Sequence, residues 1–553
     1  MRSKTSCFNG AVYLGCLGRG WPVWGAAILV WCLILPVPTL SGGSRGADFA
    51  RDLLLETGFA AGAILCAMLA IAAAMVVFSF LYQAKSTSFM AALPLRREGL
   101  FLSAWLAGFT MLAGVGVVTA VLTLLAQLAA NALCPAAVLG WLGLYLLQAL
   151  CFYGLASFCA LLTGCLWVLP LLYIALNFLV ISLWMLISGV LDKLVFGFRE
   201  LGEGLARTLT PLIRMLAWQW EPDYPRLLAL ALYALGGLVL SALALLLFRR
   251  RRMEAASDVV AVRALKPAFR WCLAIASALT FANLLYELTM DEGYRTGWML
   301  LFALIGGLVG WLSAEMLNRK SFRVRHTWPG FAVFAIVLSA LIIGCGSGCF
   351  GYERFVPDQG EITVVDFDYG GTHGEVTASA DLALLREVHT ALTGRKGESG
   401  VYQGRLYLSY TLRGGRVVQR DYRLQGLPAD MLARLDRLAE RVELEGLLAL
   451  ELDKAAVVDG DVYFADGEGG SRLLDFEEAG LLFRDCILPD LRDGGVHLTD
   501  YGWNAAVEEQ SLLASVTMEF QLPREDERHD YIRYAFQVGD PESRTWQALQ
   551  ALR

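Results

Sequence analysis

The hydrophobic residues of this chain gather into long stretches with few charged side chains. The longest runs from Gly99 to Leu191, 93 residues without an Asp, Glu, Lys or Arg. A charge at the centre of a membrane-spanning helix costs about 2.5 to 3.5 kcal/mol on insertion scales, and one crossing takes about 20 residues. The stretch therefore predicts three transmembrane helices, which we place at 101–129, 137–163 and 165–190.

Six further apolar stretches are each long enough to cross a membrane once. Two precede the charge-free stretch and four follow it, at 22–40, 57–82, 227–248, 268–288, 297–317 and 329–349. The polar segment 41–56 is expected to be a loop. The segment 191–226 balances acidic against basic residues and has enough apolar positions for short helices that rest on the bilayer. The pattern thus predicts a polytopic α-helical membrane protein with about nine transmembrane helices.

The start of the chain has a different pattern, in which positive charges lie between apolar residues. Arg2, Lys4 and Arg19 are interleaved with apolar side chains, as is typical of a short helix at a membrane surface. We therefore expect 1–21 to be a cytoplasmic interfacial helix, and a merely positive tail is the alternative. A cleaved signal peptide is disfavoured, because the next apolar stretch is long enough to cross and lacks a convincing cleavage site.

After Phe350 the pattern changes to short alternating segments of strand and helix type. An apolar/polar alternation at 361–368 predicts a strand, and 404–424 predicts a hairpin that turns at Gly414 and Gly415. Further strands are expected at 461–465, 514–522 and 530–538, and helices at 381–393, 428–447, 475–492 and 542–552. About 200 residues suffice for an independent core, so 350–553 is predicted to be an α+β domain.

The distribution of Lys and Arg orients the predicted helices. If the N-terminus is cytoplasmic, the inner segments hold 17 Lys and Arg residues, against 8 in the outer loops before residue 350. Positive residues are enriched in cytoplasmic loops, so this orientation is favoured. An odd number of crossings then makes 350–553 extracytoplasmic, in a multi-pass protein of the cell membrane.

Composition agrees with a membrane protein. Hydrophobic residues make up 56% of the chain, and the mean hydropathy is +0.52. The net charge of −6 combines a basic membrane part with an acidic remainder, and nucleic-acid binding is not expected. Of the 12 cysteines, most lie inside apolar stretches, so no disulfide framework is predicted; a bridge between Cys345 and Cys349 is left open.

No motif in the chain points to catalysis. The sequence contains neither the G-x-x-x-x-G-K-[ST] pattern of ATP-binding loops nor an H-E-x-x-H metal motif. The glycine-rich acidic stretch from Asp459 to Gly470 lacks the spacing of a calcium-binding EF-hand. We therefore predict a protein that is not an enzyme, with no catalytic residue, no metal site and no cofactor bound by this chain.

Three short passages carry a more specific pattern. They are Lys4-Thr-Ser-Cys-Phe-Asn-Gly10 with Arg19-Gly-Trp21, then Ser88-Phe-Met-Ala-Ala-Leu-Pro-Leu-Arg-Arg-Glu98, and Phe248-Arg-Arg-Arg-Arg-Met-Glu-Ala-Ala256. They resemble permease subunits of ABC-2 type transporters, in particular the Gram-positive group linked to acetoin utilisation and antibiotic-peptide response. The pattern around Glu387-Val-His389 and from Leu406 to Tyr422 is similar to an outer domain attached to some of these permeases.

The resemblance implies that the loop between the second and third transmembrane helices docks on a separate ATPase. The residues of this coupling loop are Phe89, Met90, Leu93, Pro94, Arg96, Arg97 and Glu98. Phe89 and Leu93 would supply an apolar anchor, and the two arginines charge complementarity. The alternative is that the arginines only hold the next helix at the lipid headgroups. A second implied element is a cytoplasmic basic anchor of Arg249, Arg250, Arg251, Arg252 and Glu254.

The family also implies an overall organisation. Residues 22–252 would form its six-span core, 253–349 three additional helices, and 350–553 the outer domain. The additional helices and the outer domain depart from the common family pattern. Arg96 departs from it as well, because its position often holds a hydroxyl residue in the family. The implied partners are two ABC ATPase subunits, which bind the ATP and Mg, a second permease that is the same or a related chain, and membrane lipid. An exporter is expected. The alternative is a sensing or resistance module for antimicrobial peptides whose outer domain binds the ligand.

Overall fold

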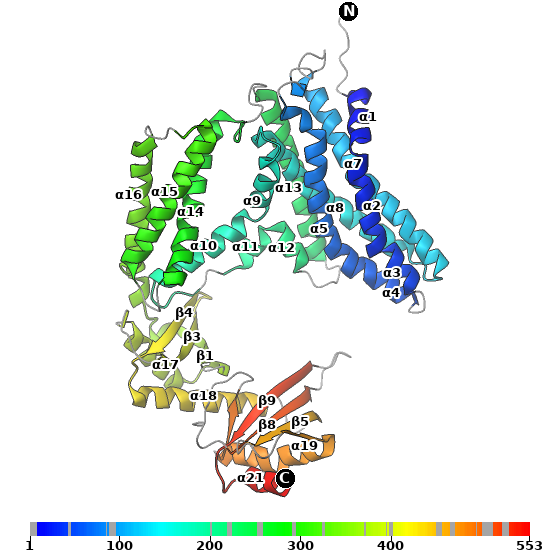
Figure 1. Ribbon diagram of the computed structural model, residues 1–553. Helices are drawn as coiled ribbons and strands as arrows, with labels where there is room; N and C mark the ends of the chain where they lie inside the picture. Colours follow the sequence, from blue (N-terminus) through cyan, green and yellow to red (C-terminus); the bar gives the residue numbers. More distant parts are fainter. Residues whose placement is uncertain are drawn as a thin grey trace, which may run out of the picture. The chain divides into compact units, whose positions relative to one another are not determined.

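The structure is a computed structural model in which the chain divides into two compact units (Figure 1). Unit 1 comprises 1–190, 201–288 and 300–339, and unit 2 comprises 191–200, 289–299 and 340–553. The residues that the structure describes are 8–42, 46–83, 86–87, 96–199, 202–217, 224–251, 258–289, 295–322, 327–369, 372–393, 395–396, 402–449, 456–464, 471–493, 495–499, 513–522 and 530–552.

Among the described residues, eight helices are long and apolar enough to cross a membrane. Their bounds are Trp21–Ser41, Gly46–Val77, Arg97–Ala129, Pro135–Leu162, Arg226–Arg250, Arg263–Thr289, Thr296–Arg319 and Trp328–Arg354. They correspond to α2 (Trp21–Ile34), α3 (Pro36–Ser41), α5 (Gly58–Val77), α7 (Arg97–Ala129), α8 (Pro135–Leu162), α13 (Tyr224–Arg250), α14 (Lys266–Thr289), α15 (Thr296–Arg319) and α16 (Trp328–Gly346). Eight of the nine predicted helices are thus confirmed as long apolar helices.

The ninth, expected as one helix over 165–190, is broken in two. The chain forms α9 (Val168–Asn177) and α10 (Leu179–Leu194), whose axes differ by 64° across Phe178. The buried Asn177 Nδ2 donates to the Tyr173 carbonyl at 3.1 Å. A side chain that hydrogen-bonds to its own helix competes with the backbone ladder, which favours a break there.

One other prediction for the first third of the chain is wrong. The segment 41–56 is largely helical, because α4 (Gly46–Asp52) and the π-helix η2 (Leu53–Thr57) lead directly into α5. A helix does form near the N-terminus, as α1 (Gly10–Arg19), capped by the Asn9 side chain. It packs along α7, where the Asn9 amide donates to Ser103 and the Tyr13 hydroxyl to Thr110. Its position at a membrane surface stays a prediction.

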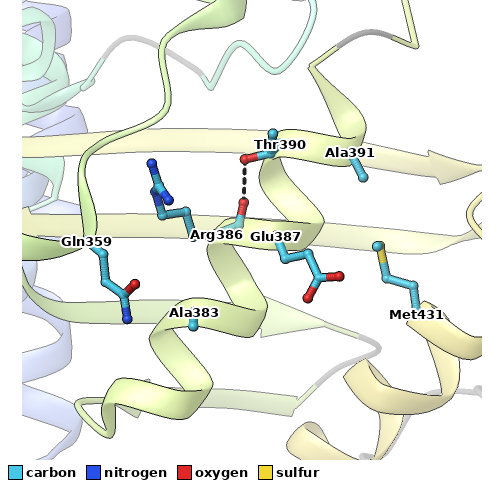
Figure 2. A pocket seen from close by; sticks show the side chains of 7 residues that line it. All are labelled: Gln359, Ala383, Arg386, Glu387, Thr390, Ala391 and Met431. Atoms are coloured by element: carbon cyan, nitrogen blue, oxygen red, sulfur yellow. Dashed lines mark hydrogen bonds between the residues drawn. The ribbon is translucent and has the colours of Figure 1, made fainter.

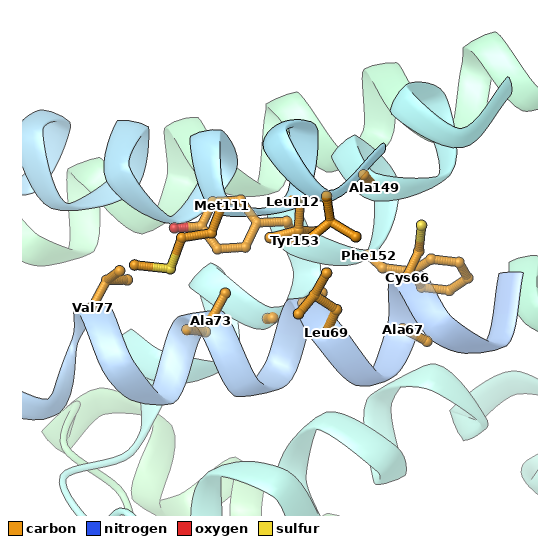
Figure 3. Close-up of a cluster of buried hydrophobic side chains, with 14 of the residues drawn as sticks. Cys66, Ala67, Leu69, Ala73, Val77, Met111, Leu112, Ala149, Phe152 and Tyr153 are labelled. Carbon is orange, nitrogen blue, oxygen red and sulfur yellow. The ribbon is translucent and has the colours of Figure 1, made fainter. Parts of the chain in front are cut away.

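Helices α5, α7, α8 and α13 form the core of unit 1 (Figure 1). Figure 3 shows side chains of α5, among them Leu69, packed with those of α7 and α8. Tyrosine hydroxyls in this core are paired: that of Tyr145 donates to the Leu112 carbonyl and that of Tyr153 to the Trp105 carbonyl. Pairing offsets the cost of burying those hydroxyls.

The direction of the helices follows from their contacts. Helices α8 and α13 run parallel, since Gly154 lies against Gly237 near their middles and Arg251 reaches the Ala160 carbonyl at their ends. The chain must therefore return to the opposite end of unit 1 between α8 and α13. The bent pair α9–α10 lies in that interval and, when its two halves are taken together, is also long and apolar enough to cross a membrane.

Helices α14, α15 and α16 form an antiparallel set. The Ser277 hydroxyl of α14 donates to the Gly306 carbonyl of α15, and Gly307 leaves room for the Phe334 ring of α16. Near the other end of the α14–α15 pair, Glu315 is paired with Arg270 and Arg319. Paired in this way, a carboxylate can be tolerated near the end of an apolar helix.

Most of unit 2 consists of two antiparallel sheets with helices, which confirms the predicted α+β region. Sheet A has the order β2-β1-β3-β4, from β1 (Ile362–Tyr369), β2 (Thr372–Val376), β3 (Tyr402–Leu412) and β4 (Val417–Gln425). Helices α17 (Ser379–Leu392) and α18 (Ala429–Ala449) accompany it, and both contribute to its core. The β3–β4 hairpin turns at Gly414 and Gly415, both at positive φ, as predicted.

Sheet B has the order β6-β5-β8-β9-β7. Its strands are β5 (Ala456–Phe464), β6 (Ser471–Leu474), β7 (Val496–Thr499), β8 (Ala514–Leu522) and β9 (Asp530–Val538), and its helical elements are α19 (Phe476–Leu482), η9 (Phe483–Ile487), α20 (Leu488–Asp493) and α21 (Arg544–Leu552). The rings of Phe483 and Phe520 meet edge to face, 4.7 Å apart, in its core. The short strands β2, β6 and β7 were not expected from the sequence, because four or five residues carry too little alternation.

Candidate functional site

The residues predicted to couple to an ATPase fall partly within the described chain. Phe89, Met90, Leu93 and Pro94 of the coupling loop, and Arg252 and Glu254 of the basic anchor, lie outside the described residues. Described are Arg96, Arg97 and Glu98 at the start of α7 and Arg249, Arg250 and Arg251 at the end of α13. Their placement gives the geometry of one end of unit 1.

The structure brings these two passages into direct contact. The Arg97 guanidinium donates to the carbonyls of Arg249 and Arg251, at 3.1 and 3.2 Å. Arg249 in turn pairs with Glu98, with 2.9 Å between nitrogen and oxygen. The charges of the Glu98–Arg249 pair also suit their helix ends, because the helix dipoles favour an acid in the first turn of α7 and bases in the last turn of α13.

Arg251 ties the same end to two further helices. Its side chain is 5% exposed and donates to the carbonyls of Ala160 and Leu161 in the last turn of α8. Tyr82, which follows the 3-10 turn η3 (Ser79–Leu81) after α5, donates its hydroxyl to the Ala160 carbonyl as well, at 3.1 Å. The ends of four helices are therefore joined by hydrogen bonds around one buried guanidinium, which we call the Arg251 node.

Around the Arg251 node the surface is positive. Arg96, Arg97, Arg249 and Arg250 are all exposed, and within this described group Glu98 is the one acidic side chain. Such a rim fits an acidic partner surface or the phosphates of lipid headgroups.

Asp258 is a residue of this end that sequence reasoning missed. Its carbonyl accepts from the Gly164 amide at 2.7 Å, and its carboxylate pairs with Lys320 at 2.9 Å and with Lys266 at 3.4 Å. Burial works to raise the pKa of Asp258, but the two lysines outweigh it and hold the pKa below its usual value. The available signal was an acidic residue within a mostly basic segment.

Unit 2 contains a second candidate site, a pocket of about 480 Å³ on α17. Figure 2 shows its lining side chains, which are Gln359, Ala383, Arg386, Glu387, Thr390, Ala391 and Met431. Arg386 donates to the Pro357 carbonyl at 3.0 Å, and Glu387 pairs with Arg434 at 3.0 Å. The pocket thus offers one cation and one anion, both already held in place.

Within the described part of the chain, no three His, Cys, Asp or Glu side chains are grouped so that they could hold a metal ion. The stretch 459–470 lies partly in strand β5 and partly outside the described residues. Comparison with known proteins gives no match: the chain matches no protein-family model, no curated protein and no solved structure.

Proposed function

We propose that this chain is the membrane-spanning permease subunit of an ABC-2 type transporter and exports a substrate with ATP hydrolysed by separate subunits. The observation that carries the proposal is the contact between the start of α7 and the end of α13. Two of the three passages that resemble the family are far apart in the sequence, and their described residues, 96–98 and 248–251, lie side by side at one end of unit 1. This is where a docked ATPase would act on several helices at once.

The Arg251 node gives a physical route for that action. The coupling loop leads into α7, which begins at Arg97. A displacement of the loop would move α7, and Arg97 and Arg251 would pass the displacement to α13 and α8 through hydrogen bonds. Hydrogen bonds from a charged donor are stronger than neutral ones, so they would keep the helix ends together during such a movement.

The proposed topology has nine crossings, with the bent pair α9–α10 as the fifth. The return of the chain between the parallel helices α8 and α13 supports a crossing there. The Arg251 node would face the cytoplasm, and so would Asp258 with its partners Lys266 and Lys320. This agrees with the excess of positive residues at that end of unit 1. The C-terminal domain would then be extracytoplasmic.

The proposed partners are those that the resemblance to ABC-2 type permeases implies. ATP and Mg would be bound by two ABC ATPase subunits, which is compatible with the lack of an ATP-binding loop motif in this sequence. A second permease, either the same chain or a related one, would complete the pathway between two halves. Membrane lipid would surround the assembly.

Co-purification tests the docking. We expect the double variant Leu93→Asp, Arg96→Glu to lose the ATPase subunit on affinity purification of the full-length chain, because it replaces an apolar anchor and reverses a charge. Arg263→Glu is the matched control, since it reverses an exposed charge near the start of α14, outside the loop. Retention of the ATPase by the double variant to the same extent as by the control contradicts the proposal.

The pocket on α17 favours a second candidate function, in which the C-terminal domain binds an antimicrobial peptide or cell-wall precursor and the chain acts in sensing or resistance. Ala383→Trp would fill the pocket, whereas Ala429→Trp, at an exposed position outside it, would not. Loss of antibiotic protection in cells with the first variant alone supports this function. Equal protection by both variants argues against it.

A further inference from the structure

The five residues Val195–Arg199, which we call the linker segment, directly follow helix α10. They belong to unit 2, together with the whole C-terminal domain. A simple tether between two parts of a protein is usually polar and exposed. The linker segment is instead attached to sheet A and to residues beside it through three sets of contacts, and a fourth holds the end of α10 from which the segment starts.

The first contact is an aromatic side chain placed in the core of the sheet. Phe196 is 6% exposed and belongs to the same hydrophobic cluster as Val365 and Leu408. Its ring lies 5.2 Å from that of Tyr422 on β4, and its amide donates to the Glu353 carboxylate at 2.9 Å. Removing this side chain would leave a cavity beside the sheet.

The second contact requires a glycine. Gly197 has a φ of +69°, and a Cβ added to it would lie 2.4 Å from the Tyr422 ring. Its carbonyl accepts from the Asp421 amide at 3.4 Å, so the segment adds to the edge of β4. Any larger residue would both strain the backbone and push the segment off the strand.

The third set of contacts is aromatic. The Arg199 guanidinium lies over the Tyr407 ring, 3.7 Å from its centroid, and the Phe198 ring is 6.4 Å from that of Tyr352. A cation over a ring is attracted to it without requiring an anion. Residues on both sides of Gly197 are therefore attached to the domain.

The fourth contact fixes the end of α10 itself. The Lys396 amine donates to the Leu194 carbonyl, which ends α10, and to the Gly346 carbonyl, which ends α16, at 2.9 Å each. It also pairs with Glu353, which is 8% exposed. One cation thus holds the C-terminal carbonyls of two helices, where the helix dipole favours positive charge.

On the unit 1 side, α10 is held by α14. The Asn283 amide of α14 donates to the Leu186 carbonyl at 3.0 Å, and a Cβ on Gly189 would lie 2.6 Å from the Asn283 oxygen. Helix α10 is therefore held at its middle by Asn283 and at its C-terminal end by Lys396, and at Phe178 it is joined to a helix whose axis differs by 64°.

We propose that the linker segment is a mechanical coupling between the C-terminal domain and the bend of α9–α10. When the conformation of the domain changes, the linker segment moves the end of α10 and the bend angle changes. A change of the bend angle in turn weakens or strengthens the contacts of the linker segment. The coupling is reciprocal, as any energetic coupling between two sites must be. It does not depend on an ATPase partner, so its test can fail or succeed separately from the proposed function.

The experiment measures the bend in the full-length protein in lipid nanodiscs, without partner subunits. Spin labels attached through noncanonical amino acids at Leu171 on α9 and Met185 on α10, both exposed, report the distance across the break. Phe196→Ala is expected to shift or broaden the distance distribution. Lys396→Met, which leaves the aromatic contacts in place, is expected to act in the same direction.

Leu435→Ala is the matched control, because it opens a cavity in the same hydrophobic cluster from α18, outside the linker segment. Hydrogen exchange of residues 195–199 verifies release, with an expected rise of about tenfold in Phe196→Ala. An unchanged distance distribution in a variant whose linker segment is released overturns the proposal. A linker segment that stays protected from hydrogen exchange in both variants also overturns the proposal. In that case the contacts of Phe196 and Lys396 are not what holds the segment in place.

The reverse direction provides an independent check. Asn283→Leu removes the bond from α14 to α10, and we expect it to raise the exchange rate of the linker segment, although residue 283 lies in unit 1. Asn318→Leu is the comparison, since it removes a bond from an asparagine side chain between α14 and α15 instead. Equal exchange of the linker segment in both variants contradicts a coupling through α10.

Discussion

His389 illustrates how burial decides the charge of a single residue. Its side chain is fully buried in α17, with Nδ1 3.0 Å from the Tyr410 hydroxyl and its ring 5.5 Å from that of Tyr422. Burial, and then the charges of Arg420 and Arg386, lower the pKa of His389 from 6.5 to about 3. The imidazole is therefore neutral in the folded protein at pH 7.

This depressed pKa predicts the pH dependence of the domain's stability. The unfolded chain takes up a proton near pH 6.5 and the folded chain only near 3, so the contribution to stability is complete above 6.5 and is lost as the pH falls towards 3. The loss is at most about 1.4 kcal/mol per pH unit. His389→Gln should flatten this dependence, measured as thermal unfolding between about pH 7 and 4. His373→Gln, at an exposed position, should keep the wild-type slope, and a wild-type slope in His389→Gln would contradict the assignment.

Arg251 gives a second prediction at the scale of one residue. Arg251→Met removes the hydrogen bonds from Arg251 to the carbonyls of Ala160 and Leu161, although Ala160 keeps its bond from Tyr82, and we expect a loss of about 1–3 kcal/mol in stability. Arg250→Met, at the exposed neighbouring position, should change stability by no more than about 0.5 kcal/mol. Thermal unfolding of the purified protein in detergent measures both. Equal unfolding midpoints for the two variants would show that the hydrogen bonds of Arg251 do not stabilise the protein.

Elements pack in unit 1 through small residues as much as through large ones. Helices α8 and α13 approach so closely that a Cβ on Gly154 would lie 2.0 Å from the Gly237 carbonyl. Small residues allow such contact between apolar helices, where lipid removes the usual hydrophobic gain of association. The sequence marks both positions only as glycines in apolar stretches, and which glycines meet depends on how the helices rotate.

Gly154→Ala is therefore expected to destabilise the protein strongly, because the added methyl group meets backbone and cannot be accommodated by a side-chain rotation. Gly236→Ala, next to Gly237 but with no atom within 4 Å of the added Cβ, should be neutral or stabilising by up to about 1 kcal/mol. The yield of monodisperse protein on size-exclusion chromatography distinguishes the two. A normal yield for Gly154→Ala would argue against this helix contact.

Most elements could be predicted from the sequence, for a simple reason. Hydropathy over about 20 residues is a strong signal, so eight long apolar helices match their predictions, and β8 and β9 match to the residue. The break at Phe178 was missed, because the sequence stays apolar across it and only the buried Asn177 interrupts the pattern. The helical content of 41–56 was missed because polar residues between two apolar stretches are equally typical of a loop.

At the scale of the whole molecule, topology is the prediction with the widest consequences. A membrane-impermeant amine reagent applied to intact cells should modify Lys454 in the C-terminal domain and should reach Lys320, at the end of α15, only after lysis. Mass spectrometry of the two peptides gives the answer. Modification of Lys320 in intact cells would overturn the orientation, and the proposed docking of a cytoplasmic ATPase with it.

Only part of the candidate site could be predicted from the sequence. The basic run at the end of α13 and the arginines at the start of α7 both stand out along the chain, but nothing indicates that they touch, because 152 positions separate Arg97 from Arg249. Contacts over such distances depend on how the helices are arranged, and a single sequence does not carry that information. Asp258 and the linker segment were missed for the same reason, since their roles come from partners on other elements, among them Lys320 and Tyr422.

The sequence by itself determined which segments are apolar helices, where the α+β region begins and where positive charge gathers. These properties follow from local composition, because hydropathy and alternation are summed over neighbouring residues. Only the tertiary structure decided that α9 and α10 bend apart, that Arg97 and Arg251 join helix ends, and that Phe196 is held in sheet A. These depend on which surfaces meet, and close packing selects among many arrangements that the same pattern allows.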